Sequence, residues 1–527
     1  MMIRRFPFKP FLRSASLLLL PAFCLLFAAC GDDGKDEIQA DGDEFPKGPI
    51  FMNEVDCHGR DWVEIGNRSD EDVDLGGWIF SDSLTDASHF YTIPAGSVVK
   101  PDGYLAVKQL KDTEAGFSFG IKCGKDTVYL LDANKDVKDK TALGEVAEGF
   151  TWGRLPNYTG SWQVTEPSQG EKNKEPEDLA EVLFDPLAVA TVTITLSEQA
   201  KTSLVASPYD YVQGDVTVTT KDGANGPATV GVRLKSGYSF QPLDKKASFK
   251  IKFNEVNSSL RVLGLKDIIL NSMVDDASMM HETVAYRLFR EAGLPAPRTG
   301  YAWVKLNDQD YGLYVIIEKY DDVFASRNYN STQHIYEGSA DLYTEKLAKF
   351  EADEGDETDT QDLQGLIDAA GKTAQNGWYD AVSAVSDIGE FAAFFAMEHY
   401  VGHRDGYSLA ANNFFLHSTD KGKFTLLPWG TDRTFAEKPA FYECSSLLCT
   451  RCMEVNDCKT LYGQALDDIT SKTEDLGLES WISQIQTVVQ SYVEKDTKKS
   501  CTNEEQLQAV QSLKTYLAGR NAEAVGK

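Results

Sequence analysis

A change in hydrophobic pattern near residue 174 constrains the fold of this chain more than any other feature. From Pro46 to about Asn173, short apolar stretches are separated by Gly, Asn, Asp and Pro. Residues 61–65, Asp-Trp-Val-Glu-Ile, alternate polar and apolar side chains, as a strand with one buried face requires. Residues 174–183 are charged, contain Pro176 and are typical of a linker. We therefore expect an all-β domain at 46–173 and a second domain at 184–527.

The second domain mixes strand and helix patterns and is expected to be α+β. Residues 190–196 and 214–220 alternate like strands, whereas 277–292 and 388–401 have helical periodicity. The acidic run 351–359 is predicted to be a loop or a loose calcium site. Alternatively, residues 358–362 cap the next helix.

The first 45 residues predict export. Four basic residues precede an apolar run that ends in small residues, which is typical of a signal peptide at 1–29. This run is shorter than the roughly 20 residues that cross a bilayer. Leu26-Phe-Ala-Ala-Cys30 resembles a bacterial lipobox, which implies acylation of Cys30 and an acidic tether at 30–45. We expect a lipid-anchored, extracytoplasmic protein of a bacterial cell envelope. The alternative is ordinary cleavage after Ala29.

The net charge limits the possible binding partners, and the cysteine content indicates which cross-links can form. The 52 basic and 81 acidic residues give a formal charge of −29, which disfavours a nucleic-acid partner. Besides Cys24 and Cys30, seven cysteines remain, and exported cysteines are usually paired. Cys57 and Cys123 could form one disulfide, while the other five lie together near the C-terminus. Cys449-Thr-Arg-Cys452 could hold zinc, but without suitably spaced histidines disulfides are favoured, and an odd number leaves one thiol free.

A lysine-bearing strand is the first of three stretches that could carry chemistry. In the segment 245–253, Phe249, Ile251 and Phe253 share one face of a strand, so that Ser248, Lys250 and Lys252 share the other. Ammonium groups beside a Gly-containing turn suit a polyphosphate. The alternative is a row of solvent-facing lysines.

Two acidic stretches follow. His403-Arg-Asp-Gly-Tyr407 with Asn412 and Asn413 places a carboxylate just after a helix and amide groups a few residues later. Leu426-Leu-Pro-Trp-Gly-Thr-Asp432 ends an apolar strand with a second carboxylate. Because hard Mg²⁺ prefers oxygen ligands, both acids could converge on one metal. Alternatively, Asp432 is a turn residue paired with Arg433.

The order of motifs resembles two known families. Asn53-Glu54, residues 61–67, residues 73–78 and Trp152-Gly-Arg-Leu-Pro156 resemble a lamin-tail domain, which implies an immunoglobulin-like sandwich. From about Val192 to Phe435, the chain resembles the CotH kinase family. The motifs that carry this resemblance are residues 263–271, 276–282, 286–289, 293–297 and 311–314 with Glu318, and the stretches above. The resemblance implies an atypical protein-kinase-like fold that transfers phosphate from ATP to Ser or Thr of exported proteins.

The resemblance to the CotH kinase family also implies roles for individual residues, according to their positions in the motifs. Asp405 would be the catalytic-loop acid, Asp432 an acid that binds Mg²⁺ or Mn²⁺, and Asn413 or Asn412 a further metal ligand. Lys250 or Lys252 would hold the nucleotide phosphates, and Glu318 would lie at the nucleotide pocket. By analogy with kinases, Glu282 could orient a lysine.

Two motifs depart from the family pattern. Lys235-Ser-Gly-Tyr-Ser239 replaces an Arg-Gly-Asn-Ser-type turn, and Gly430 replaces an acid of a Trp-Asp-x-Asp motif.

The leading hypothesis is an ATP- and Mg²⁺-dependent kinase acting on exported protein acceptors. A second hypothesis is a non-catalytic surface assembly or adhesion protein that binds partners through the CotH-like domain, since ATP is scarce outside the cytoplasm. The joint presence of Asp405, Asn413 and Asp432 argues against it. A metal-dependent hydrolase ranks last because the metal site would lack histidines. The sequence specifies no oligomeric state.

Overall fold

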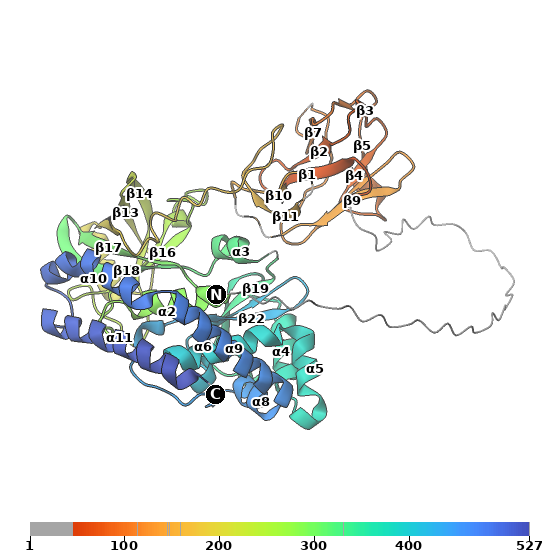
Figure 1. Ribbon diagram of the computed structural model, residues 1–527. Helices are drawn as coiled ribbons and strands as arrows, with labels where there is room; N and C mark the ends of the chain where they lie inside the picture. The colour runs from red at the N-terminus through yellow and green to blue at the C-terminus, as the bar shows by residue number, and fades with distance from the viewer. Residues whose placement is uncertain are drawn as a thin grey trace, which may run out of the picture. The chain divides into compact units, whose positions relative to one another are not determined.

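The computed structural model describes residues 46–525 except 113, 145, 147, 159 and 330 (Figure 1). The predicted signal peptide and the whole predicted tether, including Cys30, lie outside the described residues. Within the described part, the helices are all too short or too polar to cross a bilayer.

The N-terminal domain is an all-β sandwich, as predicted. One sheet has the order β11-β10-β1-β2-β7, a second has the order β5-β4-β8-β9, and β3 pairs with β6. Apolar side chains such as Phe80, Val63 and Trp152 fill its core, and a disulfide joins Cys57 to Cys123. The strands are β1 Ile50–Asp56, β2 Trp62–Asn67, β3 Val73–Asp74, β4 Ile79–Ser81, β5 Tyr91–Thr92, β6 Val98–Val99, β7 Tyr104–Lys108, β8 Thr127–Leu131, β9 Val137–Ala142, β10 Thr151–Leu155 and β11 Ser161–Thr165.

The second domain opens with a closed barrel of order β12-β13-β14-β15-β16-β18-β17, in which β12 and β17 pair in parallel. Its strands are β12 Val189–Thr195, β13 Val212–Thr220, β14 Gly223–Leu234, β15 Phe249–Lys252, β16 Asp267–Asn271, β17 Thr299–Leu306 and β18 Gln309–Glu318. Ala180, Leu183 and Phe184 are buried in the barrel core. Part of the segment predicted to be a linker therefore packs with the barrel.

A second sheet of order β20-β19-β21-β22 follows the barrel in the chain. Its strands are β19 His334–Gly338, β20 Phe350–Glu354, β21 Phe414–Ser418 and β22 Phe424–Pro428. The predicted acidic loop 351–359 is thus partly wrong, because residues 351–354 belong to a strand. Backbone pairing with β19 outweighs the acidic composition, and Lys319 Nζ lies 3.8 Å from Asp353.

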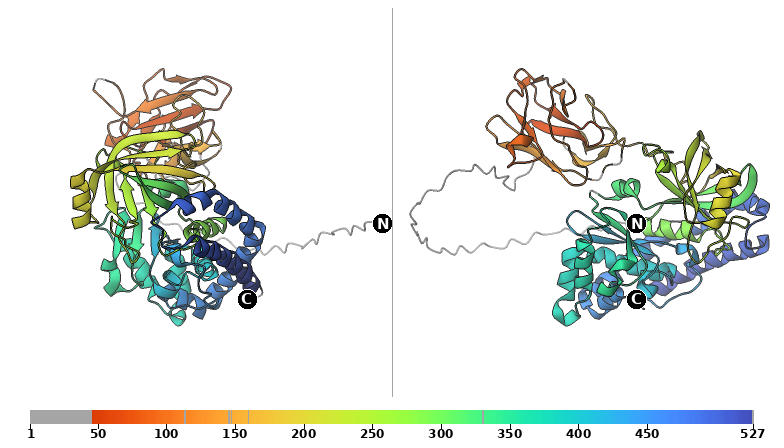
Figure 2. Two further views of the ribbon diagram at one scale, coloured as in Figure 1. Left: turned by 90° about the vertical axis from the view of Figure 1, so that its left-hand side faces the viewer. Right: turned by 180° about the vertical axis from the view of Figure 1, so that it is seen from behind.

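Helix α6 packs against β22 of this sheet and lies in the largest core together with most of the other helices, whereas α1 packs on β13 of the barrel and α10 contacts β18. The views of Figures 1 and 2 show α11 running beside α10. The helices are α1 Glu198–Ala206, α2 His281–Glu291, α3 Asp322–Asn328, α4 Gln361–Ala370, α5 Trp378–Val385, α6 Ile388–Val401, α7 Tyr407–Ala410, α8 Leu447–Glu454, α9 Asn456–Asp475, α10 Leu478–Lys495 and α11 Asn503–Ala524.

The C-terminal cysteines form disulfides, as predicted, rather than a zinc site. One bridge joins Cys444 to Cys449 and another joins Cys452 to Cys458, so the two cysteines of the Cys-x-x-Cys motif belong to different bridges. Cys501 keeps a free thiol.

Candidate active site

A polar cavity of about 260 Å³ brings most of the predicted site residues together. The loop after β14, strand β15, the loop after α6 and the turn after β22 all contribute to its walls. Its lining includes Lys235, Ser236, Gly237, Tyr238, Ser239, Lys250, Asp275, Glu337, Asp405, Asn412, Asn413, Trp429, Gly430, Asp432 and Arg433.

Asp405 is held in the cavity by two amide side chains. Helix α6 ends at Gly402, whose positive φ of 69° turns the chain into the loop that carries Asp405. Asn413 Nδ2 donates a hydrogen bond of 2.8 Å to one carboxylate oxygen of Asp405, and Asn412 Nδ2 donates one of 3.2 Å to the other. The amide oxygens of both asparagines are consequently directed away from Asp405, where they can serve as ligands.

Glu398, which the sequence analysis did not single out, organises the same loop. It is buried on α6 and accepts hydrogen bonds from the backbone N–H groups of Tyr407 (2.9 Å) and Ser408 (2.7 Å) and from the Ser408 hydroxyl (2.5 Å). His403 Nδ1 lies 3.2 Å from its carboxylate. The available sequence signal was an acid that follows the apolar run 391–397 within a helix, since buried acids require such partners.

Asp432 follows β22 in a short 3-10 turn, Thr431–Arg433. Burial raises the pKa of its carboxyl, Asp275 and Asp276 raise it further, and Lys235 opposes this shift. Gly430, where the family pattern has an acid, has a positive φ of 55°. A Cβ at this position would lie 2.9 Å from Asn413 Cγ. The glycine therefore allows the turn to pack closely against the amide that contacts Asp405.

Glu282 lies close to Asp432 but does not line the cavity. It is buried on α2, where it accepts a 2.6 Å hydrogen bond from Asn271 Nδ2. Burial, and next the charge of Asp432, raise the pKa of Glu282 well above its usual range, whereas the charge of Lys235 lowers it. Among nearby cations, Lys235 thus acts most strongly on this glutamate.

The two lysines that were predicted to bind phosphate differ in position, and only one of them lines the cavity. Lys250 lines the cavity, where burial and the charge of Arg233 lower its pKa while Glu337 opposes them. Lys252 does not line it, and its ammonium group lies 3.0 Å from Glu255. Strand alternation puts both on one face but does not indicate which end of the strand meets the cavity.

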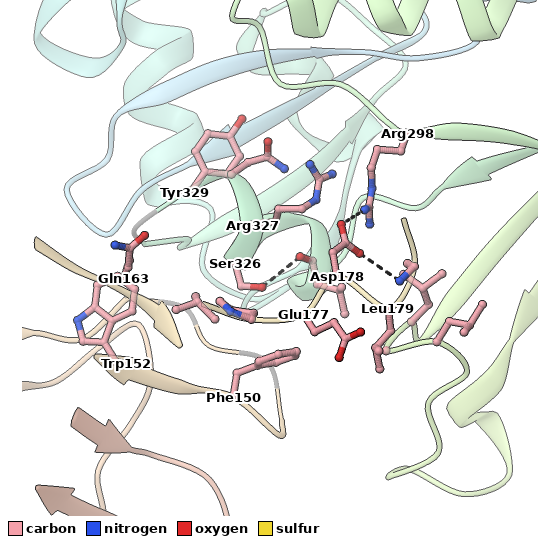
Figure 3. A pocket seen from close by; sticks show the side chains of 18 residues that line it. Phe150, Trp152, Gln163, Glu177, Asp178, Leu179, Arg298, Ser326, Arg327 and Tyr329 are labelled. Carbon is pink, nitrogen blue, oxygen red and sulfur yellow. Dashed lines mark hydrogen bonds and ion pairs between the residues drawn. The ribbon is translucent and has the colours of Figure 1, made fainter. Parts of the chain in front are cut away.

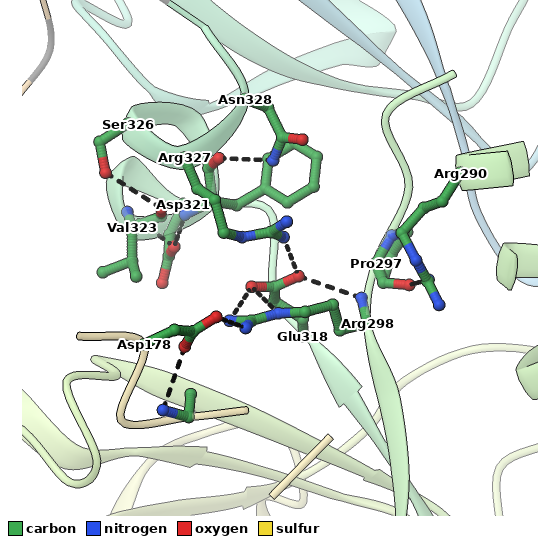
Figure 4. Close-up of polar contacts among 12 residues, drawn as sticks. Asp178, Arg290, Pro297, Arg298, Glu318, Asp321, Val323, Ser326, Arg327 and Asn328 are labelled. Carbon is green, nitrogen blue, oxygen red and sulfur yellow. Dashed lines mark hydrogen bonds and ion pairs between the residues drawn. The ribbon is translucent and has the colours of Figure 1, made fainter. Parts of the chain in front are cut away.

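Glu318 lies in a buried ion cluster outside the cavity (Figure 4). Arg298 donates to it through Nε (3.0 Å), Nη2 (2.8 Å) and its backbone N–H (3.0 Å), and Arg327 donates from the other side. Burial alone would raise the pKa of Glu318, but Arg327 and Arg298 outweigh it and hold that pKa below its usual value. Arg298 also pairs with Asp178 (Figure 3). The position predicted for a nucleotide contact is therefore occupied by a structural ion cluster.

Lys235, Asp275 and Glu337 complete the cavity and were not predicted as site residues. Lys235 begins the Gly-containing turn Lys235-Ser-Gly-Tyr-Ser239, which was a usable signal. The sequence gives no comparable signal for Glu337, because β19 reaches the cavity only through the pairing of the second sheet.

The donor set of the cavity suits a divalent cation bound to phosphate. Asp405, Asp432 and the amide oxygens of Asn412 and Asn413 are hard oxygen ligands of the kind that Mg²⁺ prefers. Burial and the charges of Asp275 and Asp276 raise the pKa of Asp432, an arrangement that a divalent cation would relieve. Lys235 and Lys250 supply positive charge for phosphate oxygens.

Comparisons with known proteins agree with this arrangement. A family model described as CotH kinase protein matches residues 235–523, and one described as Lamin Tail Domain matches residues 44–145. Both resemblances predicted from the motifs are confirmed.

Two curated relatives come from Bacillus subtilis (strain 168). Inner spore coat protein H is 24% identical over 205 residues, which cover 36% of this chain and 55% of the relative. Inner spore coat protein H-like protein is 33% identical over 76 residues, which cover 14% of this chain and 23% of the relative. The chain therefore spans about half the length of the first relative and less of the second.

Proposed function

Because the chain belongs to the CotH kinase protein family, we propose that it is an atypical kinase that transfers phosphate from ATP to Ser or Thr hydroxyl groups of exported proteins. The observation that carries this proposal is the convergence of Asp405, Asn413, Asp432 and Lys250 on one cavity, although these residues come from three separate stretches of the chain. A protein that only binds a partner would not require this combination of groups.

The transfer assigns a distinct task to each group. The acceptor hydroxyl attacks the γ-phosphorus, an O–P bond forms, the bond from phosphorus to the β–γ bridging oxygen breaks, and ADP leaves. The Asp405 carboxylate accepts the hydroxyl proton, and Asn413 and Asn412 hold that carboxylate in place. Lys250 binds phosphate oxygens at the other wall of the cavity.

Asp432 and Asp405, with Asn413 or Asn412, would hold Mg²⁺ or Mn²⁺. When bound, the metal supplies positive charge that neutralises the phosphate oxygens. Gly430 supplies no carboxylate, so the metal set is one acid smaller than the Trp-Asp-x-Asp pattern provides.

The direct test is phosphate transfer by the full-length protein. With labelled ATP, Mg²⁺ or Mn²⁺ and a mixture of exported proteins as acceptors, we expect label transfer that falls by at least about 100-fold in Asp405→Ala and in Asp432→Ala. Asp222→Ala is a matched control, because Asp222 is an exposed turn residue outside the cavity. It is expected to behave like the unsubstituted protein.

Absence of label transfer, together with absence of a nucleotide-induced rise in melting temperature, would contradict the kinase proposal. Such a result would favour the alternative of a non-catalytic assembly or adhesion protein. Transfer that survives both aspartate substitutions would contradict the residue roles.

The place of action is also proposed. The lipobox-like sequence at Cys30 supports a protein anchored by lipid to a bacterial membrane and facing away from the cytoplasm. Its acceptors would then be envelope or extracellular proteins.

A further inference from the structure

Lys235 stands at a fixed point of the cavity wall. Its backbone N–H donates a 2.8 Å hydrogen bond to Ser248 O, which extends the pairing of β14 with β15 by one step. The Ser248 hydroxyl is in turn bonded to Ser272 Oγ (2.9 Å) and lies 3.3 Å from Asn271 Oδ1. The base of the loop 235–239 is thus part of a buried polar network.

The same network reaches Glu282, the buried acid beside Asp432. Asn271 bonds Ser248 on one side and Glu282 on the other, and Glu282 lies beside Asp432. The loop base and helix α2 are therefore connected by buried side chains, and α2 packs against the turn after β22. Lys235 begins the loop at this network and lines the cavity.

Of the three cations that line the cavity, only Arg433 forms an ion pair among the residues that the structure describes. Arg433 Nη2 lies 3.0 Å from Asp275, and its guanidinium group lies 4.5 Å from the ring centre of Tyr238. Lys250 lies toward Glu337 and Asp353, at the wall formed by β15 and β19. Within the part of the chain that the structure describes, Lys235 has no ion-pair partner, although its charge acts on both Asp432 and Glu282.

We propose that Lys235 is a further catalytic residue, whose ammonium group contacts the phosphoryl group that is transferred while Lys250 contacts the remaining phosphates. This inference rests on the proposed kinase function. Asp432 and Asp405 mark the end of the cavity where transfer occurs, and Lys235 is the unpaired cation at that end. A positive charge there stabilises the charge on the departing phosphoryl oxygens without itself giving up a proton. The departure from the family's arginine turn would then preserve a cation, supplied by a lysine.

Affinity for two nucleotides tests this assignment without relying on activity. In full-length Lys235→Met protein, calorimetry with Mg²⁺ and a non-hydrolysable ATP analogue should show affinity lowered about tenfold, whereas affinity for ADP should change less than about twofold. Lys250→Met should weaken both nucleotides. Lys252→Met is the matched control, since Lys252 lies on the same strand face but outside the cavity, and should weaken neither.

Transfer rates give the second measurement. Lys235→Met should lower kcat by about 100-fold with a smaller change in the KM for ATP, and Lys235→Arg should restore most of the rate because it keeps the charge. Equal losses of ATP and ADP affinity, or a kcat within about threefold of the unsubstituted protein, would overturn the assignment. If the unsubstituted protein neither binds nucleotide nor transfers phosphate, the kinase function itself fails, and the role of Lys235 fails with it.

Discussion

At the residue scale, the environment of a side chain decides its role more than its type does. Lys250 and Lys252 share one strand face, yet one lines the cavity and the other pairs with Glu255. Glu282 and Glu318 are both buried acids, but their pKa values shift in opposite directions. Two arginines stabilise the charged form of Glu318, whereas Glu282 lies beside a second acid. Motif position alone could not distinguish these cases.

A buried histidine on β21 is expected to make the fold sensitive to acid. His417 on β21 stacks on Tyr329, with ring centres 3.5 Å apart, and burial lowers its pKa to about 3. An unfolded histidine has a pKa of about 6.5, so the unfolded chain binds the additional proton below that pH. His417 therefore destabilises the folded state progressively as pH falls below about 6.5, by up to about 1.4 kcal/mol per pH unit.

His417→Phe tests this by keeping an aromatic ring against Tyr329 while removing the titration. At pH 8, the variant should melt at a lower temperature, because it loses the contact of Nε2 with Thr332 Oγ1 at 3.0 Å. Between pH 6.5 and pH 4.5, the difference should shrink or reverse. Melting temperatures that differ by a constant amount across this range would refute the assignment.

At the element scale, α6 positions the loop that carries Asp405. Its start is capped by Asp387, which accepts hydrogen bonds from the N–H groups of Gly389 and Glu390, and its end is set by Gly402. Glu398, one turn before that end, reaches forward to the start of α7. The loop bearing Asp405 is thus closed between two helices by one carboxylate.

Glu398→Gln should slow transfer without weakening nucleotide binding. A glutamine offers one oxygen where three N–H or O–H donors converge, so one donor would face an amide N–H and the loop would shift. We expect kcat to fall about 10- to 100-fold with little change in the KM for ATP. Rates measured over a range of ATP concentrations would show this split. A rise in KM at unchanged kcat would instead place Glu398 in nucleotide binding.

How far elements could be predicted from the sequence depends on whether their ends are set locally. The helix predicted at 388–401 matches α6, because Asp387 and Gly402 are neighbouring signals. The helix predicted at 277–292 begins only at His281, because Asp276 accepts bonds from the N–H groups of Ser278 and Met280 and keeps that stretch in a turn.

The structural features that the sequence did not predict depend on contacts between segments that are far apart in the chain. Strand β20 depends on pairing with β19, and the cluster of Glu318 depends on Arg298 and Arg327. No pattern within a short window of sequence specifies these partners. The acids and amides of the candidate site could be predicted because they lie in short motifs, whereas Glu337 enters the cavity only through the assembly of the second sheet.

At the scale of the whole molecule, charge bears on the proposed binding of a nucleotide. The chain has a formal charge of −29, and the cavity lining contains four acids, Asp275, Glu337, Asp405 and Asp432, against three cations, Lys235, Lys250 and Arg433. If the cavity binds ATP as proposed, these acids would repel the free polyphosphate, so the nucleotide should enter as its metal complex. Transfer should therefore depend strictly on a divalent cation.

The proposed lipid anchor at Cys30 can be tested separately from catalysis. If Cys30 carries the lipid, Cys30→Ser should move the protein from the membrane fraction to the soluble fraction and remove the acyl mass from the N-terminal peptide in mass spectrometry. Cys501→Ser is the matched control, because Cys501 also has a free thiol but lies in the folded domain, so this variant should stay with the membrane. Cys30 lies outside the cavity sequence, so the Cys30→Ser protein should keep its rate of phosphate transfer. A Cys30→Ser protein that still sediments with membranes would show that another part of the molecule binds them.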